Sequence, residues 1–182
     1  MQVPTLRDIY RAKKTIAPYI ARTPLHYSSG LSEMLSAEVY LKHEEHLPLG
    51  AFKGRGGINL LANLSDEEKE RGLITASSGN HGQSMASACK LFGVKAVIGL
   101  PEDANPNKVA AMRALGAELV FHGADFDAAR LHCERLAKEE GYRFVHPVND
   151  PLLIAGVATQ ALETLEDLPD VEVLMLPLGG GS

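Results

Sequence analysis

The sequence predicts an α/β fold built on a parallel sheet of βαβ units. From residue 73 onward, short apolar runs alternate with helix-like stretches of roughly ten residues. The run KAVIGL (95–100) is typical of a strand covered on both faces. Proline just inside a helix start and glycine just past its end, as at Asn105-Pro106 and Gly116, mark where the helices begin and stop.

The first part of the chain is expected to begin with a helix. Thr5 and Asp8 form a capping-box pattern. The apolar residues spaced to share one face of this helix are Leu6, Ile9, Ile16 and Ile20. Because the residue before a proline avoids the helical region, Thr23-Pro24 is expected to end the helix. A short helix over 30–36, a strand over 39–42, a loop and a helix from Lys53 are expected next.

In the rest of the chain, expected strands alternate with expected helices. The expected strands are 73–76, 95–100, 118–121, 143–145 and 171–178. The expected helices are 80–92, 105–115, 125–140 and 150–168, and SDEEKER (65–71) is expected to be a solvated helix face. The chain stops in a glycine loop at the end of the last expected strand, where ligands bind in such folds. We therefore expect this chain to be the front part of a longer protein.

Composition limits the class of partner. The 182 residues carry a net charge of -5, which argues against a broad basic face for nucleic acid. The N-terminus lacks the apolar core of a signal peptide, and the longest uncharged helical run, 152–162, is too short to span a bilayer. Cys89 and Cys133 are expected to be reduced, buried thiols. We expect a cytoplasmic protein with no nucleic-acid or membrane partner.

Three segments could carry chemistry. In GAFKGRGG (50–57), the glycines would let the backbone approach a ligand closely, and burial could make Lys53 a Schiff-base nucleophile. In TASSGNHGQ (75–83), hydroxyls, an amide and the N–H groups of a helix start could bind an anion such as a carboxylate. The terminal GGGS (179–182) could form a phosphate nest. Each segment taken alone also fits a simpler reading, as a solvated lysine, an ordinary helix cap or a flexible tail.

The loop before Lys53 also contains residue types that bind metals. These are His43 and His46, with Glu44 and Glu45 between them. Because they lie in a loop without a distant partner, we expect no metal there.

Taken in order, these segments resemble the serine/threonine dehydratase group of fold-type II pyridoxal-phosphate enzymes, whose architecture is like that of the tryptophan synthase β subunit. The resemblance runs through RTPL (22–25), KHEEHLPLGAFKGRGG (42–57), SSGNHGQ (77–83), the stretch 101–118, HPVNDPLLIAG (146–156) and LPLGGGS (176–182). The order of the motifs makes this resemblance specific.

The resemblance implies a role for each motif. Lys53 would hold the cofactor, pyridoxal 5'-phosphate, as a Schiff base and act as the base, with Phe52 beside the ring and Asn80 bonded to the ring hydroxyl. Ser78 matches a serine that works on the opposite face of the substrate in related racemases. The phosphate would be cradled by Gly179, Gly180, Gly181 and Ser182. The substrate carboxylate would be received by Ser77, Ser78, Gly79, Asn80 and His81.

The activity implied is β-elimination from a small hydroxy amino acid, such as L-threonine or L-serine, to a 2-oxo acid and ammonia. The alternatives are a serine racemase of the same family, a β-replacement synthase, and a fragment or ligand-binding module without turnover. SSGNHGQ followed by the proline-containing loop favours the dehydratase and racemase branch over the synthases. Departures from the commonest pattern at Leu47, Ala51, 157–158 and Ser182 put the substrate preference in doubt, not the reaction type.

The resemblance also implies a domain division. Residues 1–51 would begin a large domain, 52–149 would form a small domain, and 150–182 would start the second segment of the large one. The full-length protein would form a homodimer or higher homo-oligomer, with any cation or ring-nitrogen ligand in the part that is absent.

Overall fold

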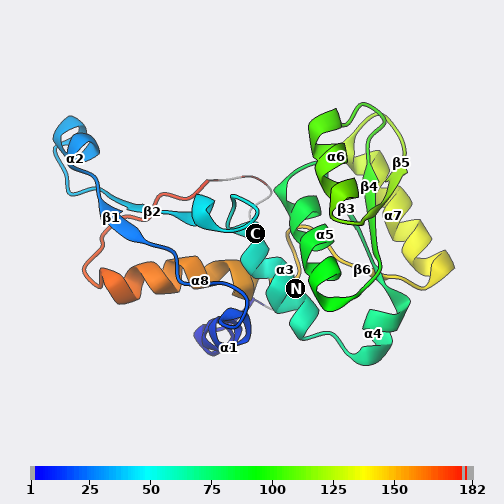
Figure 1. Cartoon of the computed structure of the whole chain (residues 1–182), viewed down its shortest axis with the longest axis horizontal. Coiled ribbons are helices and arrows are strands. Elements are labelled where there is room, and N and C mark those ends of the chain that lie inside the picture. Colours follow the sequence, from blue (N-terminus) through cyan, green and yellow to red (C-terminus); the bar gives the residue numbers. More distant parts are fainter. Residues whose placement is uncertain (1–2, 178, 180–182) are drawn as a thin grey trace.

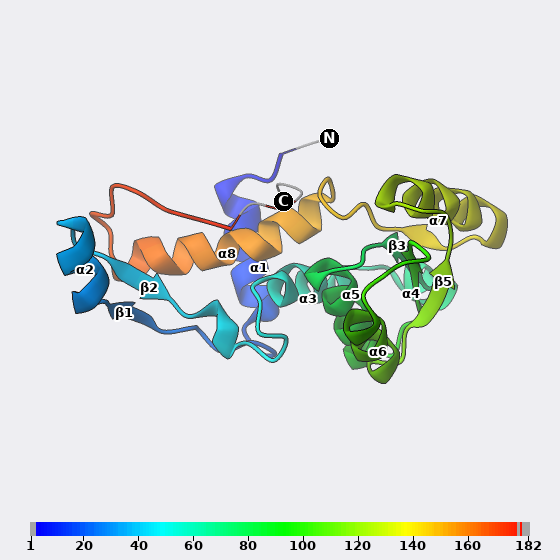
Figure 2. The ribbon, with the colours of Figure 1, turned by 90° about the horizontal axis from the view of Figure 1, so that it is seen from above.

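The computed structural model describes residues 3–177 and 179. Figures 1 and 2 show an elongated molecule with the sheet and its helices at one end, and with α1, α2, α8 and the β1–β2 pair at the other. The helix α3 (Lys53–Ala62) lies between the two ends and contacts α5, α8 and α1. The domain boundaries at 52 and 150 remain a prediction.

The observed elements follow the expected order. The helices are α1 (Leu6–Ile16), α2 (Ser29–Leu35), η1, a 3₁₀ helix (Glu44–His46), α3 (Lys53–Ala62), α4 (Asp66–Arg71), α5 (Asn80–Phe92), α6 (Pro106–Ala114), α7 (Phe126–Glu140) and α8 (Pro151–Asp167). The strands are β1 (Leu25–Tyr27), β2 (Tyr40–Lys42), β3 (Leu73–Ala76), β4 (Ala96–Leu100), β5 (Glu118–Phe121) and β6 (Arg143–Phe144). No helix in the described part of the chain combines the length and apolarity needed to cross a membrane.

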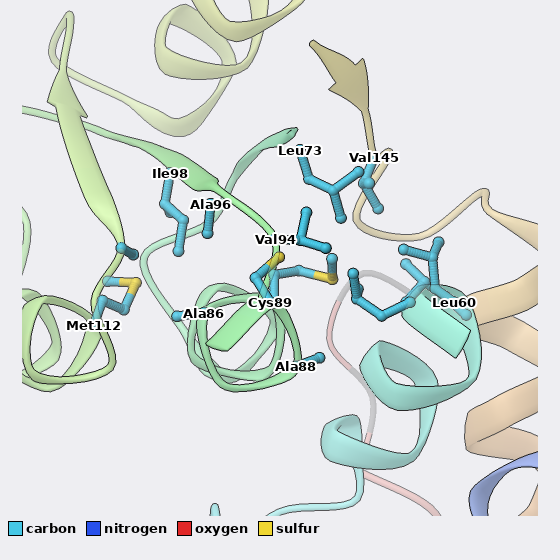
Figure 3. Close-up of a cluster of buried hydrophobic side chains, with 14 of the residues drawn as sticks. Leu60, Leu73, Ala86, Ala88, Cys89, Val94, Ala96, Ile98, Met112 and Val145 are labelled. Carbon is cyan, nitrogen blue, oxygen red and sulfur yellow. The ribbon is translucent and has the colours of Figure 1, made fainter. Parts of the chain in front are cut away.

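The main sheet is parallel, as predicted. Its four strands lie in the order β5-β4-β3-β6, and each neighbouring pair is parallel. Side chains of β3 and β4 alternate between two cores, since successive residues of a strand point to opposite faces. One core, which faces α5 and α6, includes Leu73 and Ile98; the other, which faces α7, includes Ile74 and Val97. Figure 3 shows the larger core, in which Leu60 of α3 joins Leu73 and Val145.

The helix starts confirm the capping signals. Thr5 and Asp8 form the expected capping box of α1. Side-chain oxygens of Ser65, Asn105, Asp125 and Asp150 accept a backbone N–H at the starts of α4, α6, α7 and α8.

Two expectations at the ends of the chain are wrong. Helix α1 ends at Ile16 instead of Thr23, because Pro18 has no N–H to continue the helix. Ile20 is buried beyond the helix, and Leu6 is exposed, so these two residues do not lie on one buried helix face.

The strand expected over 171–178 is absent from its described part. Residues 171–177 form no strand, and this segment runs back beside α8 (Figure 2). Among the described residues neither sheet offers it a partner, and a strand is defined by its pairing. Val173 and Met175 are 72% and 89% exposed, as expected for an apolar segment left without a sheet.

Two of the glycines after Lys53, Gly56 and Gly57, serve helix packing, which corrects the interpretation of these two as part of a ligand cradle. A Cβ on Gly56 would lie 2.9 Å from the carbonyl oxygen of Leu153 in α8, and a Cβ on Gly57 would lie 2.4 Å from Ser84 Oγ in α5. On α8, a Cβ at Gly156 would lie 2.7 Å from the Cα of Gly56. These glycines therefore let α3 approach both neighbouring helices closely.

Cys89 and Cys133 are both free and buried, as predicted. Burial raises the pKa of Cys89 to about 12 and that of Cys133 to about 11, so both remain thiols at neutral pH. Cys133 packs against Gly99, where an added Cβ would lie 2.1 Å from Sγ.

This contact predicts a compensating pair of substitutions. Gly99→Ala should lower the free energy of unfolding by about 1–3 kcal/mol, the usual cost of overpacking. Cys133→Ala removes the obstructing Sγ and leaves the nearest other atom 3.4 Å away, so Gly99→Ala should cost much less in that background. Denaturant unfolding of both single variants and the double variant measures this. An equal cost in both backgrounds would show that Sγ is not the obstacle.

Candidate active site

Lys53 is the first residue of α3 and lies at the centre of the molecule. Its side chain is half-buried, and burial lowers the pKa of its amine below 10.5. Its Nζ lies 5.1 Å from the centroid of the Phe52 ring. Its carbonyl oxygen accepts a 2.6 Å hydrogen bond from Ser84 Oγ, which ties the start of α3 to α5. A lysine with a lowered pKa has a larger share of neutral, nucleophilic amine.

The segment 77–81 joins the carboxyl end of β3 to the start of α5. Ser77 is buried and its Oγ accepts the Gly79 N–H at 3.2 Å, whereas Ser78 and Asn80 are exposed. Gly79 occupies the N-cap position of α5 and provides no side-chain hydrogen bond there. The N–H groups at this helix start are therefore available to an anion, which the helix dipole also favours.

The structure brings Lys53 and this segment together. The helices α3 and α5 are packed side by side (Figure 1), and Lys53 is close enough to His81 to affect its pKa. The amine and the open helix start therefore belong to one site.

His81 has a different position from the other members of its segment. Its ring is buried and its Nε2 lies 3.0 Å from Thr75 Oγ1, which also donates to the Val145 carbonyl at 2.8 Å. Burial first, and then the positive charge of Lys53 and the proximity of His146, lower the pKa of His81 to about 3. The ring is thus neutral, and its Nε2 is engaged with Thr75, so the backbone is what His81 offers to an anion.

The buried neutral ring predicts a loss of stability in acid. The pKa of His81 is about 3 when folded and 6.5 ordinarily, so the unfolded chain takes up a proton first as pH falls. The contribution of the neutral His81 ring to the free energy of unfolding is complete above pH 6.5. It is lost as the pH falls toward 3, by at most about 1.4 kcal/mol per pH unit. Free energies of unfolding measured across this range should show a shallower slope in His81→Gln. The control His26→Gln replaces an exposed histidine and should keep the slope; an unchanged slope in His81→Gln would contradict the assignment.

Arg55 was not identified as a key residue from the sequence. Its side chain is 0% exposed and lies 2.8 Å from Glu44 and 2.7 Å from Glu163 in ion pairs. Lys42 Nζ also contacts Glu163 at 2.7 Å, and Thr23 Oγ1 donates to Glu44 at 2.6 Å. Burial alone would raise the pKa of Glu163, but hydrogen bonds from Arg55 and Lys42 outweigh it and hold that pKa below its usual value. This network fixes α3, and with it Lys53, against α8 and η1.

Lys108 is a second residue that sequence reasoning did not single out as part of the site. Its Nζ lies 3.4 Å from Asn80 Oδ1, so it adds a cation beside the open start of α5. The sequence signal that could have identified Lys108 is its position within the stretch 101–118, one of the segments that resemble the family. Of the expected phosphate loop, Gly179 is exposed, and Gly180, Gly181 and Ser182 lie outside the described residues.

Comparison with known proteins places these features in a family. Residues 16–182 match the family model described as "Pyridoxal-phosphate dependent enzyme". The chain is 47% identical over 177 residues to the L-threonine ammonia-lyase of Thermotoga maritima, covering 97% of this chain and 44% of that protein. It is 43% identical over 178 residues to the catabolic L-threonine dehydratase of Staphylococcus aureus strain USA300, covering 97% of this chain and 51% of that protein.

A solved structure shows the same fold. The serine racemase of Dictyostelium discoideum superimposes with a TM-score of 0.85 at 35% identity, over 92% of this chain and 55% of that one. The chain thus spans about half the length of the relatives it matches.

Proposed function

This chain belongs to the pyridoxal-phosphate-dependent enzyme family, and from that membership we propose that the protein is an ammonia-lyase. It would convert a small hydroxy amino acid, such as L-threonine or L-serine, to a 2-oxo acid and ammonia. The observation that carries the proposal is the half-buried Lys53, with its lowered pKa, beside the open start of α5. The names of the relatives from Thermotoga maritima and Staphylococcus aureus support the substrate class.

The described residues fit the cofactor. Lys53 is the residue type that forms covalent bonds with the aldehyde of pyridoxal phosphate, and its burial favours the neutral amine that reacts. Phe52 provides an apolar ring next to Lys53 Nζ. Asn80 would hydrogen-bond the ring hydroxyl. The proposed phosphate ligands Gly180, Gly181 and Ser182 lie outside the described residues, and Gly179 precedes them.

Different residues of this chain would bind the substrate and transfer the proton. Pyridoxal phosphate, when bound, supplies an electron sink for the negative charge that develops at the substrate α-carbon. The polar segment Ser77, Ser78, Gly79, Asn80 and His81 would bind the substrate carboxylate at the α5 start and so fix the position of the α-carbon. The Lys53 amine would take the α-proton, because burial lowers its pKa and so enlarges the share of neutral amine that can accept one.

Racemisation is a second candidate activity. Ser78 is exposed on the segment that receives the carboxylate, and the matching Dictyostelium discoideum structure is named a serine racemase. A hydroxyl that returns a proton to the face opposite Lys53 would invert the α-carbon. Dehydration needs the Lys53 side alone, so the two activities depend on different residues.

One experiment distinguishes these functions. The protein, supplied with pyridoxal phosphate, is incubated separately with L-threonine and L-serine, and 2-oxo acid and the D-isomer are assayed. The lyase proposal predicts 2-oxo acid from at least one substrate. D-serine without 2-oxo acid would make the protein a racemase. If neither product forms although the cofactor is bound, the protein is a binding module without turnover, and the lyase proposal is overturned.

The role of Ser78 gives a further prediction. Ser78→Ala should lower any D-serine formation by about 10²–10⁴-fold, the usual contribution of a positioned acid or base. It should leave 2-oxo acid formation within a few-fold of the parent, because Lys53 remains and the backbone N–H groups of the α5 start can still bind the carboxylate. The ratio of the two products, measured by chiral chromatography, checks this. Equal loss of both products would mean that Ser78 acts in carboxylate binding alone and not in proton transfer.

The cellular location and the oligomeric state of the protein are also proposed. We propose that it acts in the cytoplasm, which fits the amino-acid substrate named for its relatives, and that the full-length protein forms a homodimer or higher homo-oligomer. Light scattering coupled to size-exclusion chromatography tests the oligomer, and a monomeric mass would contradict it.

A further inference from the structure

Three side chains outside the proposed active site bring metal-binding atoms together. One ligand atom from each of His43, Glu45 and His46 lies within 4.8 Å of the others. His43 Nδ1 is 2.5 Å from Glu45 Oε1, and His46 Nε2 is 4.0 Å from the same oxygen. His43 is partly buried, with 21% of its side chain exposed, while Glu45 and His46 are open to solvent. The proposed reaction uses none of the three.

The backbone explains why these residues meet. Residues 44–46 form η1, with His43 as its N-cap, and in a 3₁₀ helix the side chains at positions i and i+3 lie directly above one another. This places the rings of His43 and His46 side by side, with centroids 5.2 Å apart. Glu45 then reaches both rings from the position between them.

The turn is also held in place from the inside. Glu44 is largely buried and forms its ion pair with the fully buried Arg55. From the distant strand β1, the ring of His26 packs against His43 at 5.1 Å between centroids. A site on an anchored turn loses less conformational freedom when it binds a ligand than a site on a flexible loop does.

We propose that His43, Glu45 and His46 bind a divalent transition-metal ion, with zinc as the best match. Imidazole nitrogen and carboxylate oxygen are zinc ligands, and three protein ligands leave a fourth tetrahedral position for water. The structure changes the setting from which no metal was expected, although all three ligands still come from one segment. The segment is a 3₁₀ turn instead of an open loop, and a distant residue, His26, packs on it.

The test is a zinc titration of the protein without an affinity tag, followed by isothermal titration calorimetry. The proposal predicts one saturable ion per chain. His46→Ala and Glu45→Gln each remove one exposed ligand, so both should still fold, which circular dichroism checks. Each should weaken zinc binding by at least about tenfold, the loss that even an outer-shell partner produces.

The controls separate this site from other surface groups. His132→Ala removes a histidine of the stacked His122–His132 pair, whose centroids lie 4.1 Å apart, and Glu33→Gln removes an exposed carboxylate on α2. Both controls should bind zinc like the parent. The proposal is overturned if the parent binds no zinc, if His46→Ala and Glu45→Gln bind it unchanged, or if His132→Ala is the variant that loses it.

Discussion

Replacing Lys53 with alanine should lower kcat/KM for 2-oxo acid formation by about 10²–10⁴-fold or more, the range that a positioned general base contributes. The reason is that Lys53 is proposed both to hold the cofactor and to take the α-proton. Its half-buried position and lowered pKa suit both tasks. The measurement is the initial rate of 2-oxo acid formation with saturating pyridoxal phosphate.

Two further variants make this prediction specific. Lys53→Arg keeps the positive charge and much of the length but should be equally inactive, because a guanidinium stays protonated. Lys90→Ala, at the exposed end of α5, should keep the parent rate. Added methylamine should partly restore Lys53→Ala by supplying a free base. Parent-like rates in Lys53→Ala would contradict the role given to this lysine.

Replacing Arg55 with methionine should lower the free energy of unfolding by about 3–5 kcal/mol, the cost of removing one partner of a buried ion pair. The loss leaves Glu44 and Glu163 without the guanidinium that satisfies both carboxylates. Because the network holds α3 against α8, the effect should appear as a lower denaturant midpoint. The urea unfolding curve measures it.

A matched control uses the same substitution on the surface. Arg135 pairs with Glu139 at 3.8 Å, and both side chains are more than half exposed. Arg135→Met should therefore cost no more than about 1 kcal/mol, since exposed ion pairs contribute little. Combining Arg55→Met with Glu163→Gln should cost less than the sum of the single changes, because the two residues are in contact. Additive costs, or equal costs for the two arginine variants, would contradict the buried network.

The sheet and its helices could be predicted from the sequence because local signals and burial agree there. The strand of Leu73–Ala76 and the helix of Asn80–Phe92 have the predicted bounds. Asp125 caps the helix that Gly141 ends, where Gly141 has a φ of 79°. Each signal acts within a few residues, so no knowledge of the tertiary structure is needed to find it.

The errors in the predicted elements arise where contacts with distant residues, or a local signal that was not used, determine whether an element forms and where it ends. Strand β1 is only three residues long and exists through its antiparallel pairing with β2, which the sequence around Leu25 does not reveal. The segment 171–177 has a strand-like composition but no partner among the described residues. The early end of α1 had a local signal, Pro18, that was passed over in favour of Pro24.

The residues of the candidate site also differ in whether local sequence or distant contacts reveal them. Lys53 and the segment 77–81 could be found because their motifs are contiguous in sequence. Arg55 could not, because its partners Glu44 and Glu163 lie on other elements. The one available hint in the sequence was a charged residue, Glu163, in the otherwise uncharged part of α8. Gly56 was misread for the same reason, since its neighbour Gly156 is far away in sequence.

Lys53 is proposed to carry the cofactor, and borohydride reduction tests this assignment. The protein is mixed with pyridoxal phosphate, its visible absorption is recorded, and it is then reduced with borohydride, digested and mapped by mass spectrometry. We expect a visible band that borohydride removes, together with a stable adduct on the peptide that contains Lys53. An adduct on another lysine such as Lys108, or no visible band at all, would contradict it.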